Sequence, residues 1–169
     1  MTKRVLVCYA TRYGSTAGIA QIIGEELEKS GFLVDVINVL EIEDTAPYDA
    51  IVIGSPLYMG KWLVEARDFV QRFKHPLNQR MVFVFTVGYS LKDLARENIK
   101  SAEEALDTIR LDINPSDAAF FAGMVNPDIM SVQDAAITRM GRVDAGDFRD
   151  WGRIREWAAK LAEELRSSP

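Results

Sequence analysis

A short apolar run that leads directly into a hydroxyl-rich turn constrains the fold of this chain more than any other feature. The run covers residues 5–9, and the turn, residues 10–16, leads into an amphipathic helical pattern. Because the run is apolar throughout, it is typical of a strand buried on both faces, as in a parallel sheet flanked by helices. Ligands of such sheets bind beyond the carboxyl ends of the strands, where this turn is expected to lie.

The turn combines hydroxyl side chains with the start of a helix. A helix N-terminus offers unpaired backbone N–H groups and a partial positive charge, and Thr11, Ser15 and Thr16 add further donors. The turn has neither the Gly-Lys-Ser/Thr ending of a nucleotide P-loop nor the Gly-x-Gly-x-x-Gly pattern of a dinucleotide site. The pattern therefore suits a terminal phosphate monoester. The alternative is an ordinary strand-to-helix turn in which Ser15 or Thr16 caps the helix.

Composition limits the domain count and the classes of partner. The 169 residues, 48% of them hydrophobic, can build one substantial core, so we expect a single domain over residues 1–169. Residues 1–4 run directly into the first strand and no apolar stretch approaches bilayer length, so we expect a cytoplasmic protein without an integral membrane segment. A net charge of −5 without a basic stripe argues against nucleic acid as a partner. The acidic surface suits docking to basic redox proteins, or serves solubility alone.

Neither metal binding nor a disulfide is expected. The chain contains one cysteine, Cys8, and one histidine, His75, and their spacing matches no transition-metal site. Cys8 lies inside the first predicted strand, so we interpret it as a structural thiol.

Further apolar runs alternate with helical patterns along the chain. Strands are predicted at residues 5–9, 32–40, 50–54, 81–85 and 118–123, and helices at residues 17–31, 61–74 and 91–110. A last helix is predicted to begin near Asp147 or Asp150, as its cap, and to run to Arg166. Asp35 and Asn38 interrupt the second run, which favours a position near the sheet edge. Trp151 and Trp157 follow the apolar face of the last helix, so we expect them in the core. Residues 124–146 exceed the usual connection length and are predicted to form a lid or a covering helix.

Two more strand ends carry glycine, hydroxyl and aromatic residues. One is the stretch from Ser55 to Lys61, and the other is the stretch from Thr86 to Ser90. A phosphoacceptor receiver of similar topology would need acidic residues at the end of the first strand, and Tyr9-Ala10-Thr11 provides none.

The hydroxyl turn, with aromatic-bearing loops after the third and fourth strands, resembles the flavodoxins. The resemblance implies a doubly wound α/β fold with five parallel strands in the order 2-1-3-4-5, helices on both faces, and FMN as the cofactor. It implies a phosphate loop made of Thr11, Arg12, Tyr13, Gly14, Ser15 and Thr16. It further implies that one side of the isoalloxazine is flanked by Ser55, Pro56, Leu57, Tyr58, Met59 and Gly60, and that the other is covered by Thr86, Val87, Gly88 and Tyr89.

Three of these positions have a more specific implied role. Tyr58 and Tyr89 are the candidates for stacking on the flavin ring, and the alternative is a pair of loop tyrosines packed on the surface. Gly60 would let the peptide before it turn over when flavin N5 gains a proton, because a positive φ costs glycine nothing. The alternative is that Gly60 is only a turn residue before a helix.

A closer resemblance is to the flavodoxin-like, menaquinone-dependent protoporphyrinogen oxidases. The chain shares their Thr-Arg-x-Gly-x-Thr loop, an Ala122-Gly123 pair after the last strand, and Asp150-Trp151 before the last helix. It departs from them at Tyr58-Met59-Gly60-Lys61, where that family tends to carry Tyr-Gly-His. It also lacks the strongly basic loops expected of an enzyme that docks on membranes.

Two classes of function follow from these resemblances. The flavin passes electrons to a partner protein, or it oxidises or reduces a small substrate such as a quinone or a porphyrinogen, the latter as in heme biosynthesis. In both classes the flavin carries the chemistry, so no catalytic residue is assigned to the chain. An open flavin edge would favour the partner protein, and a cavity under residues 124–146 would favour the substrate.

Overall fold

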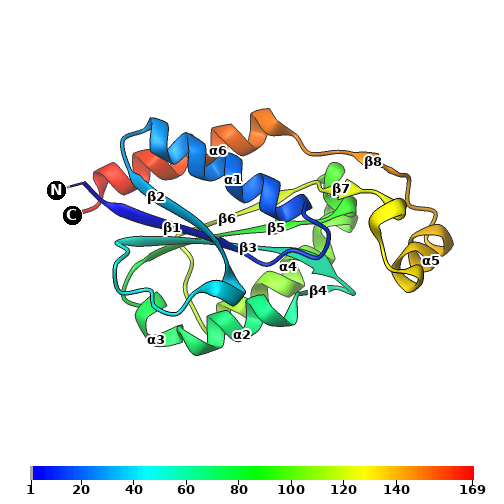
Figure 1. Cartoon of the computed structure of the whole chain (residues 1–169), viewed down its shortest axis with the longest axis horizontal. Coiled ribbons are helices and arrows are strands. Elements are labelled where there is room, and N and C mark those ends of the chain that lie inside the picture. The colour runs from blue at the N-terminus through cyan, green and yellow to red at the C-terminus, as the bar shows by residue number, and fades with distance from the viewer. Residues whose placement is uncertain (1) are drawn as a thin grey trace.

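Five parallel strands form the centre of the molecule (Figure 1). The computed structural model describes residues 2–169. The strands are β1 (Arg4–Tyr9), β2 (Leu33–Asn38), β3 (Ala50–Tyr58), β5 (Met81–Val87) and β6 (Asp117–Phe121). They lie in the order β2-β1-β3-β5-β6, with every neighbouring pair parallel. The predicted order 2-1-3-4-5 is therefore confirmed, and so is the edge position of the strand that carries Asp35.

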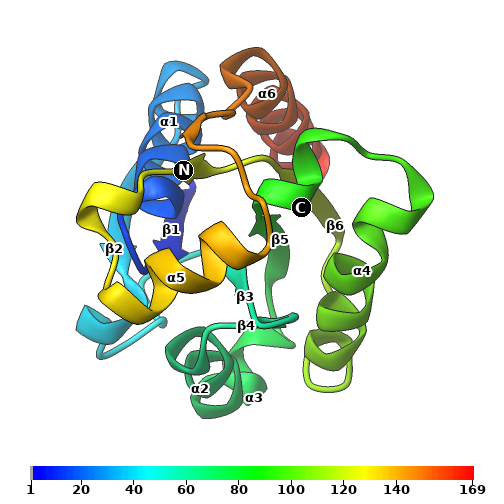
Figure 2. The ribbon, with the colours of Figure 1, turned by 90° about the vertical axis from the view of Figure 1, so that its right-hand side faces the viewer.

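Helices cover both faces of this sheet (Figure 2). On one face lie α1 (Ser15–Lys29) and α6 (Trp151–Ser167), and on the other lie α2 (Val64–Arg72), α3 (Lys74–Leu77) and α4 (Arg96–Arg110). Successive residues of β1 point to opposite faces, so Val5 and Val7 join the core under α1 and α6 while Leu6 and Cys8 join the core under α2 and α4. Two faces of buried apolar side chains explain why the central strands are apolar throughout.

The last helix contributes its tryptophans to the core as expected. Trp157 is buried, packs edge-on against Phe85 and donates its indole N–H to Asp117 at 3.0 Å. Trp151 is partly buried against the same core.

The helix predicted at residues 61–74 differs from the structure at both ends. β3 continues to Tyr58, turns, and returns as the short antiparallel strand β4 (Lys61–Trp62), so the helix begins only at Val64. Met59 and Gly60 both have positive φ, 52° and 77°, which is the geometry of a two-residue hairpin turn. His75, expected to end the helix, instead lies within α3.

The helix predicted to begin at Leu91 also starts later. Residues Tyr89–Lys92 form a single 3₁₀ turn, η2, and α4 begins at Arg96. Leu91 is nevertheless buried, because the 3₁₀ turn points its side chain into the core.

Residues 124–147, which we call the covering segment, leave the sheet and return to it. The segment contains β7 (Met124–Val125), the 3₁₀ turn η3 (Pro127–Ile129), α5 (Val132–Met140) and β8 (Gly146–Asp147). β7 and β8 pair antiparallel, with Met124 opposite Asp147, so the two ends of the segment lie side by side. α5 lies across the end of the molecule, in front of the sheet in Figure 2, and is the covering helix that the sequence predicted. No helix within residues 2–169 is long and apolar enough to cross a bilayer.

Candidate functional site

The turn after β1 brings three hydroxyl groups to the N-terminus of α1. Gly14, at the N-cap, has a φ of 92° in the left-handed region, and its N–H donates to Thr11 Oγ1 at 2.9 Å. Ser15 Oγ accepts a hydrogen bond from the N–H of Met124 at 3.0 Å, which ties the turn to the covering segment. No side chain caps α1, so the alternative interpretation of Ser15 or Thr16 as a helix cap is wrong.

The hydroxyl of Thr16 has no hydrogen-bond partner among the described residues. Its side chain is only 1% exposed, and its Oγ1 is buried without a donor or acceptor. A buried hydroxyl without a partner costs free energy, and such groups are rare in folded proteins. Here the group lies in the first turn of a helix, beside unpaired backbone N–H groups, where an anion binds favourably.

Two adjoining cavities open at the carboxyl ends of β1, β3 and β5. The smaller has a volume of about 130 Å³ and is lined in part by Thr11, Ser15, Thr16, Val87 and Gly88. The larger has a volume of about 260 Å³ and lies between these strand ends and α5. Both are bordered by Arg12, Tyr13, Pro56, Leu57 and Tyr89, so the two cavities share a wall.

The two predicted ring-stacking tyrosines lie in the wall of the larger cavity. Tyr58 donates its hydroxyl to Asp134 at 2.7 Å, and Tyr89 packs edge-on against Phe148 with ring centroids 5.5 Å apart. Both contacts are with the covering segment or the residue that follows it. Neither tyrosine is therefore a loop side chain that packs only on the surface.

Several of the predicted residues lie outside the cavity walls. Ser55 and Thr86 are buried beneath them, where Ser55 Oγ accepts from the N–H of Leu63 at 3.0 Å and Thr86 Oγ1 accepts from the indole of Trp62 at 2.9 Å. These hydroxyls hold the β3–β4 hairpin against β5. Among the turn residues, Met59 lines the larger cavity, whereas Gly14 and Gly60 do not.

The covering segment contributes side chains that the sequence analysis did not single out. Val125, Ile137 and Val143 give the larger cavity apolar walls, and Asp134 places a carboxylate among them. Arg149, just after the segment, lies with Nη1 3.5 Å from the carbonyl of Ser15 at the N-terminus of α1. No local pattern marks these residues, because each reaches the site only through the path of the segment.

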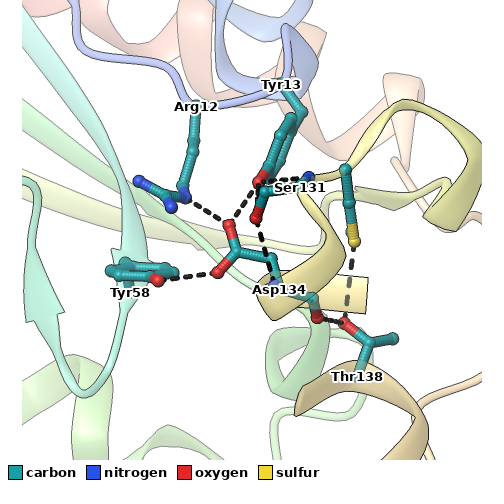
Figure 3. Close-up of polar contacts among 7 residues, drawn as sticks. Arg12, Tyr13, Tyr58, Ser131, Asp134 and Thr138 are labelled. Atoms are coloured by element: carbon teal, nitrogen blue, oxygen red, sulfur yellow. Dashed lines mark hydrogen bonds and ion pairs between the residues drawn. The ribbon is translucent and has the colours of Figure 1, made fainter. Parts of the chain in front are cut away.

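Asp134 is the electrostatic centre of the site (Figure 3). Its Oδ2 accepts from Arg12 Nε at 2.7 Å and from the hydroxyl of Tyr13, and its Oδ1 accepts from Tyr58. Hydrogen bonds from Arg12 and Tyr13 hold the pKa of Asp134 well below its usual range, so the carboxylate is charged at neutral pH. The guanidinium of Arg12 also stacks over the ring of Tyr58, with Cζ 4.2 Å from the ring centroid. Its side chain thus points to α5 and not to the N-terminus of α1.

The chain belongs to the flavodoxin-domain family, whose profile matches residues 6–150. Membership implies FMN as the cofactor and identifies an FMN-binding redox protein with a redox partner. No curated protein sequence matches the chain significantly.

Solved structures support the same fold. A flavodoxin from Streptococcus pneumoniae TIGR4 has a TM-score of 0.63 at 18% identity, covering 95% of this chain and 99% of that one. Flavodoxin 2 from Bacillus cereus has a TM-score of 0.60 at 20% identity, with coverages of 95% and 99%. A flavodoxin from the domain Archaea has a TM-score of 0.61 at 16% identity, with coverages of 96% and 99%. At these identities the likeness extends to the fold and not to the redox partner.

Proposed function

We propose that FMN binds across the two adjoining cavities, with its phosphate in the smaller one and its isoalloxazine ring in the larger one under α5. The observation that carries the proposal is the buried, unpartnered hydroxyl of Thr16 at the N-terminus of α1. A phosphate in the smaller cavity would accept a hydrogen bond from this hydroxyl and from the unpaired N–H groups of the helix.

The remaining predicted residues take roles according to their positions. Pro56, Leu57, Tyr58 and Met59 would flank one side of the ring, and Val87, Gly88 and Tyr89 the other, since all of them border the cavities. Ser55 and Thr86 would act indirectly, because their hydroxyls hold the hairpin that carries Tyr58 and Met59. Arg12 would orient the covering segment more than the phosphate, since its guanidinium is paired with Asp134.

We further propose that the bound flavin reacts with a small, planar, largely apolar substrate. Bound FMN supplies transfer of one or two electrons, while the chain orients the ring and excludes water. The supporting observation is that α5 covers part of the larger cavity, whose walls include Leu57, Val125 and Ile137. Quinones and porphyrinogens belong to this substrate class, and the motif resemblance keeps a menaquinone-dependent protoporphyrinogen oxidase as the specific hypothesis.

Electron transfer to a protein is the second candidate. It is supported by exposed apolar side chains on the elements that border the site: Met59, in the wall of the larger cavity, is 73% exposed, and Met140, at the end of α5, is 84% exposed. Such side chains at the rim of a cofactor site suit contact with another protein surface.

Calorimetric titration with FMN, FAD and riboflavin tests the cofactor assignment. We expect one FMN per chain and no FAD binding, because the site offers one anion loop and no second loop for a pyrophosphate. Binding of FAD without FMN would contradict the proposal.

The substrate class is tested with the holoprotein under anaerobic conditions. The reduced form is mixed with a water-soluble menaquinone analogue or with ferredoxin, the oxidised form is mixed with protoporphyrinogen, and flavin absorbance is followed. Free FMN at the same concentration is the control for unassisted reaction. Faster reaction than the control with quinone or porphyrinogen supports the substrate hypothesis, whereas acceleration with ferredoxin alone would replace it with the carrier function.

A further inference from the structure

α5 is attached to the molecule in an unusual way. A surface helix normally buries an apolar stripe against the core. In α5, all of which is described, Asp134 is the single buried residue, while Val132 and Met140 are 87% and 84% exposed. The helix is therefore held mainly by polar contacts of one carboxylate, with little of the apolar burial that secures the other long helices.

The carboxylate of Asp134 joins α5 to two other parts of the chain (Figure 3). Arg12 and Tyr13 come from the turn after β1, and Tyr58 comes from the end of β3. We call this cluster of four residues the Asp134 clasp. Ser131 helps to aim the carboxylate, because its hydroxyl oxygen accepts from the N–H of Asp134 at 3.1 Å and its own N–H donates to the hydroxyl of Tyr13 at 3.2 Å.

The clasp lies in the wall of the cavity that would hold the flavin ring. Arg12, Tyr13, Tyr58 and Asp134 all line the larger cavity, and α5 covers it. A planar ligand in this cavity would lie against α5. Because the helix buries little apolar surface, the hydrogen bonds of the clasp are the main contacts that hold it in this position.

We propose that Asp134 is the positioning residue of the flavin site, which holds α5 closed over the cavity and sets the orientation of Tyr58 and Arg12 in its wall. The proposal rests on the proposed binding of FMN in this site. It makes opening of the clasp the step that admits and releases the flavin ring.

The closed position of α5 is tested first on the protein without cofactor. Arg139 and Arg142 are exposed at the end of α5, so trypsin cleavage after them reports opening of the segment. In Asp134→Asn the charge is lost with little change of shape, and we expect cleavage to accelerate by about tenfold or more, since hydrogen bonds to charged groups are the strong ones. Asp128→Asn is the matched control, because Asp128 is an exposed carboxylate of the same segment.

Three further variants test the pairing itself. Arg12→Gln removes the cation from the other side of the clasp, and the double variant Arg12→Gln/Asp134→Asn should be cleaved no faster than Asp134→Asn alone. Asp134→Glu should recover part of the slow cleavage. Melting temperatures of all variants separate opening of α5 from global unfolding, which would speed cleavage throughout the chain.

The role toward the cofactor is tested by exchange of bound FMN with isotopically labelled FMN, followed by mass spectrometry. We expect exchange to be about tenfold faster in Asp134→Asn, with a smaller change in equilibrium affinity, since opening assists both entry and release. Cleavage and exchange rates equal to those of Asp128→Asn would overturn the proposal. Absence of FMN binding in the wild type would instead refute the proposed function and the cofactor role of Asp134 with it, while the trypsin assay would still decide whether the clasp holds α5.

Discussion

Thr16 carries a residue-scale prediction about the anion site. Valine has nearly the shape of threonine but no hydroxyl, so Thr16→Val removes the unpartnered group. Without cofactor, the variant should be as stable as the wild type or more stable, because a buried unsatisfied hydroxyl is lost. Its FMN affinity should fall by about 1–3 kcal/mol, since a donor to a charged acceptor is missing. Calorimetric titration measures this loss, and riboflavin, which has no phosphate, is the control ligand. An equal loss of riboflavin affinity would mean that Thr16 shapes the fold and not the phosphate site.

Gly60 and Met59 carry a second prediction at this scale. Both have positive φ in the two-residue turn between β3 and β4, so the backbone favours glycine at position 60 whether or not a flavin is bound. A Cβ at Gly60 would meet no atom within 4 Å, so Gly60→Ala should destabilise the protein by about 1 kcal/mol through φ strain only. Met59→Asn should act in the opposite direction, because asparagine tolerates the left-handed region. Urea unfolding measures both changes, and an unchanged midpoint in Gly60→Ala would show that the turn relaxes to another geometry.

At the scale of elements, a glycine in β3 leaves the space that a phenylalanine ring of β5 occupies. Gly54 lies in β3 opposite Phe85 of β5, and a Cβ at Gly54 would be only 2.0 Å from Cζ of the phenylalanine ring. Phe85 is fully buried, so its ring has no free space to enter. Gly54→Ala should therefore destabilise the protein by about 1–3 kcal/mol, measured by urea unfolding. Phe85→Leu should offset part of this loss in the double variant, and strictly additive effects would contradict the close contact as the cause.

For the whole molecule, carboxylates that are paired with arginines predict the dependence of stability on pH. Hydrogen bonds from Arg12 to Asp134, from Arg155 to Glu26 and from Arg149 to Asp147 lower the pKa of each carboxyl in the folded protein. A lowered pKa contributes stability that is present above the unfolded value, about 4, and is lost as pH falls toward the folded value.

The free energy of unfolding should accordingly change little between about pH 7 and pH 5.5 and fall steeply below about pH 4. Urea midpoints measured across this range test the expectation. Glu26→Gln removes the ion pair between α1 and α6 and should show a shallower decrease on the acid side. A maximum of stability near pH 4 would contradict the assignment of these groups.

Much of this architecture is predictable from local patterns. The buried strands, the stripes of α1 and α6 and the hydroxyl turn at residues 10–16 each depend on neighbours within a few positions in the chain. Backbone sterics and the burial of apolar side chains act over such short separations, so periodicity is enough to predict these elements and the order of the sheet follows from the flavodoxin resemblance.

The hairpin at Met59 and Gly60 shows where local patterns fail. Trp62 fits the apolar stripe of a helix starting at residue 61, yet it belongs to β4 and donates its indole to Thr86, 24 positions away. Apolar residues near the end of an element fit both the helical period and the strand period. A contact with another strand then decides which of the two structures forms.

The sequence by itself determined the fold class and, through the flavodoxin resemblance, the cofactor, because these depend on short-range patterns and on a motif within residues 11–16, which it also predicts to be the phosphate loop. Only the tertiary structure decided that the hydroxyl of Thr16 is left without a partner and that α5 covers part of the cavity. Arg12 and Asp134 are 122 positions apart, and nothing near either residue indicates the other. Their pairing depends on where the covering segment returns across the strand ends, which is set by packing of the whole chain and not by its local order.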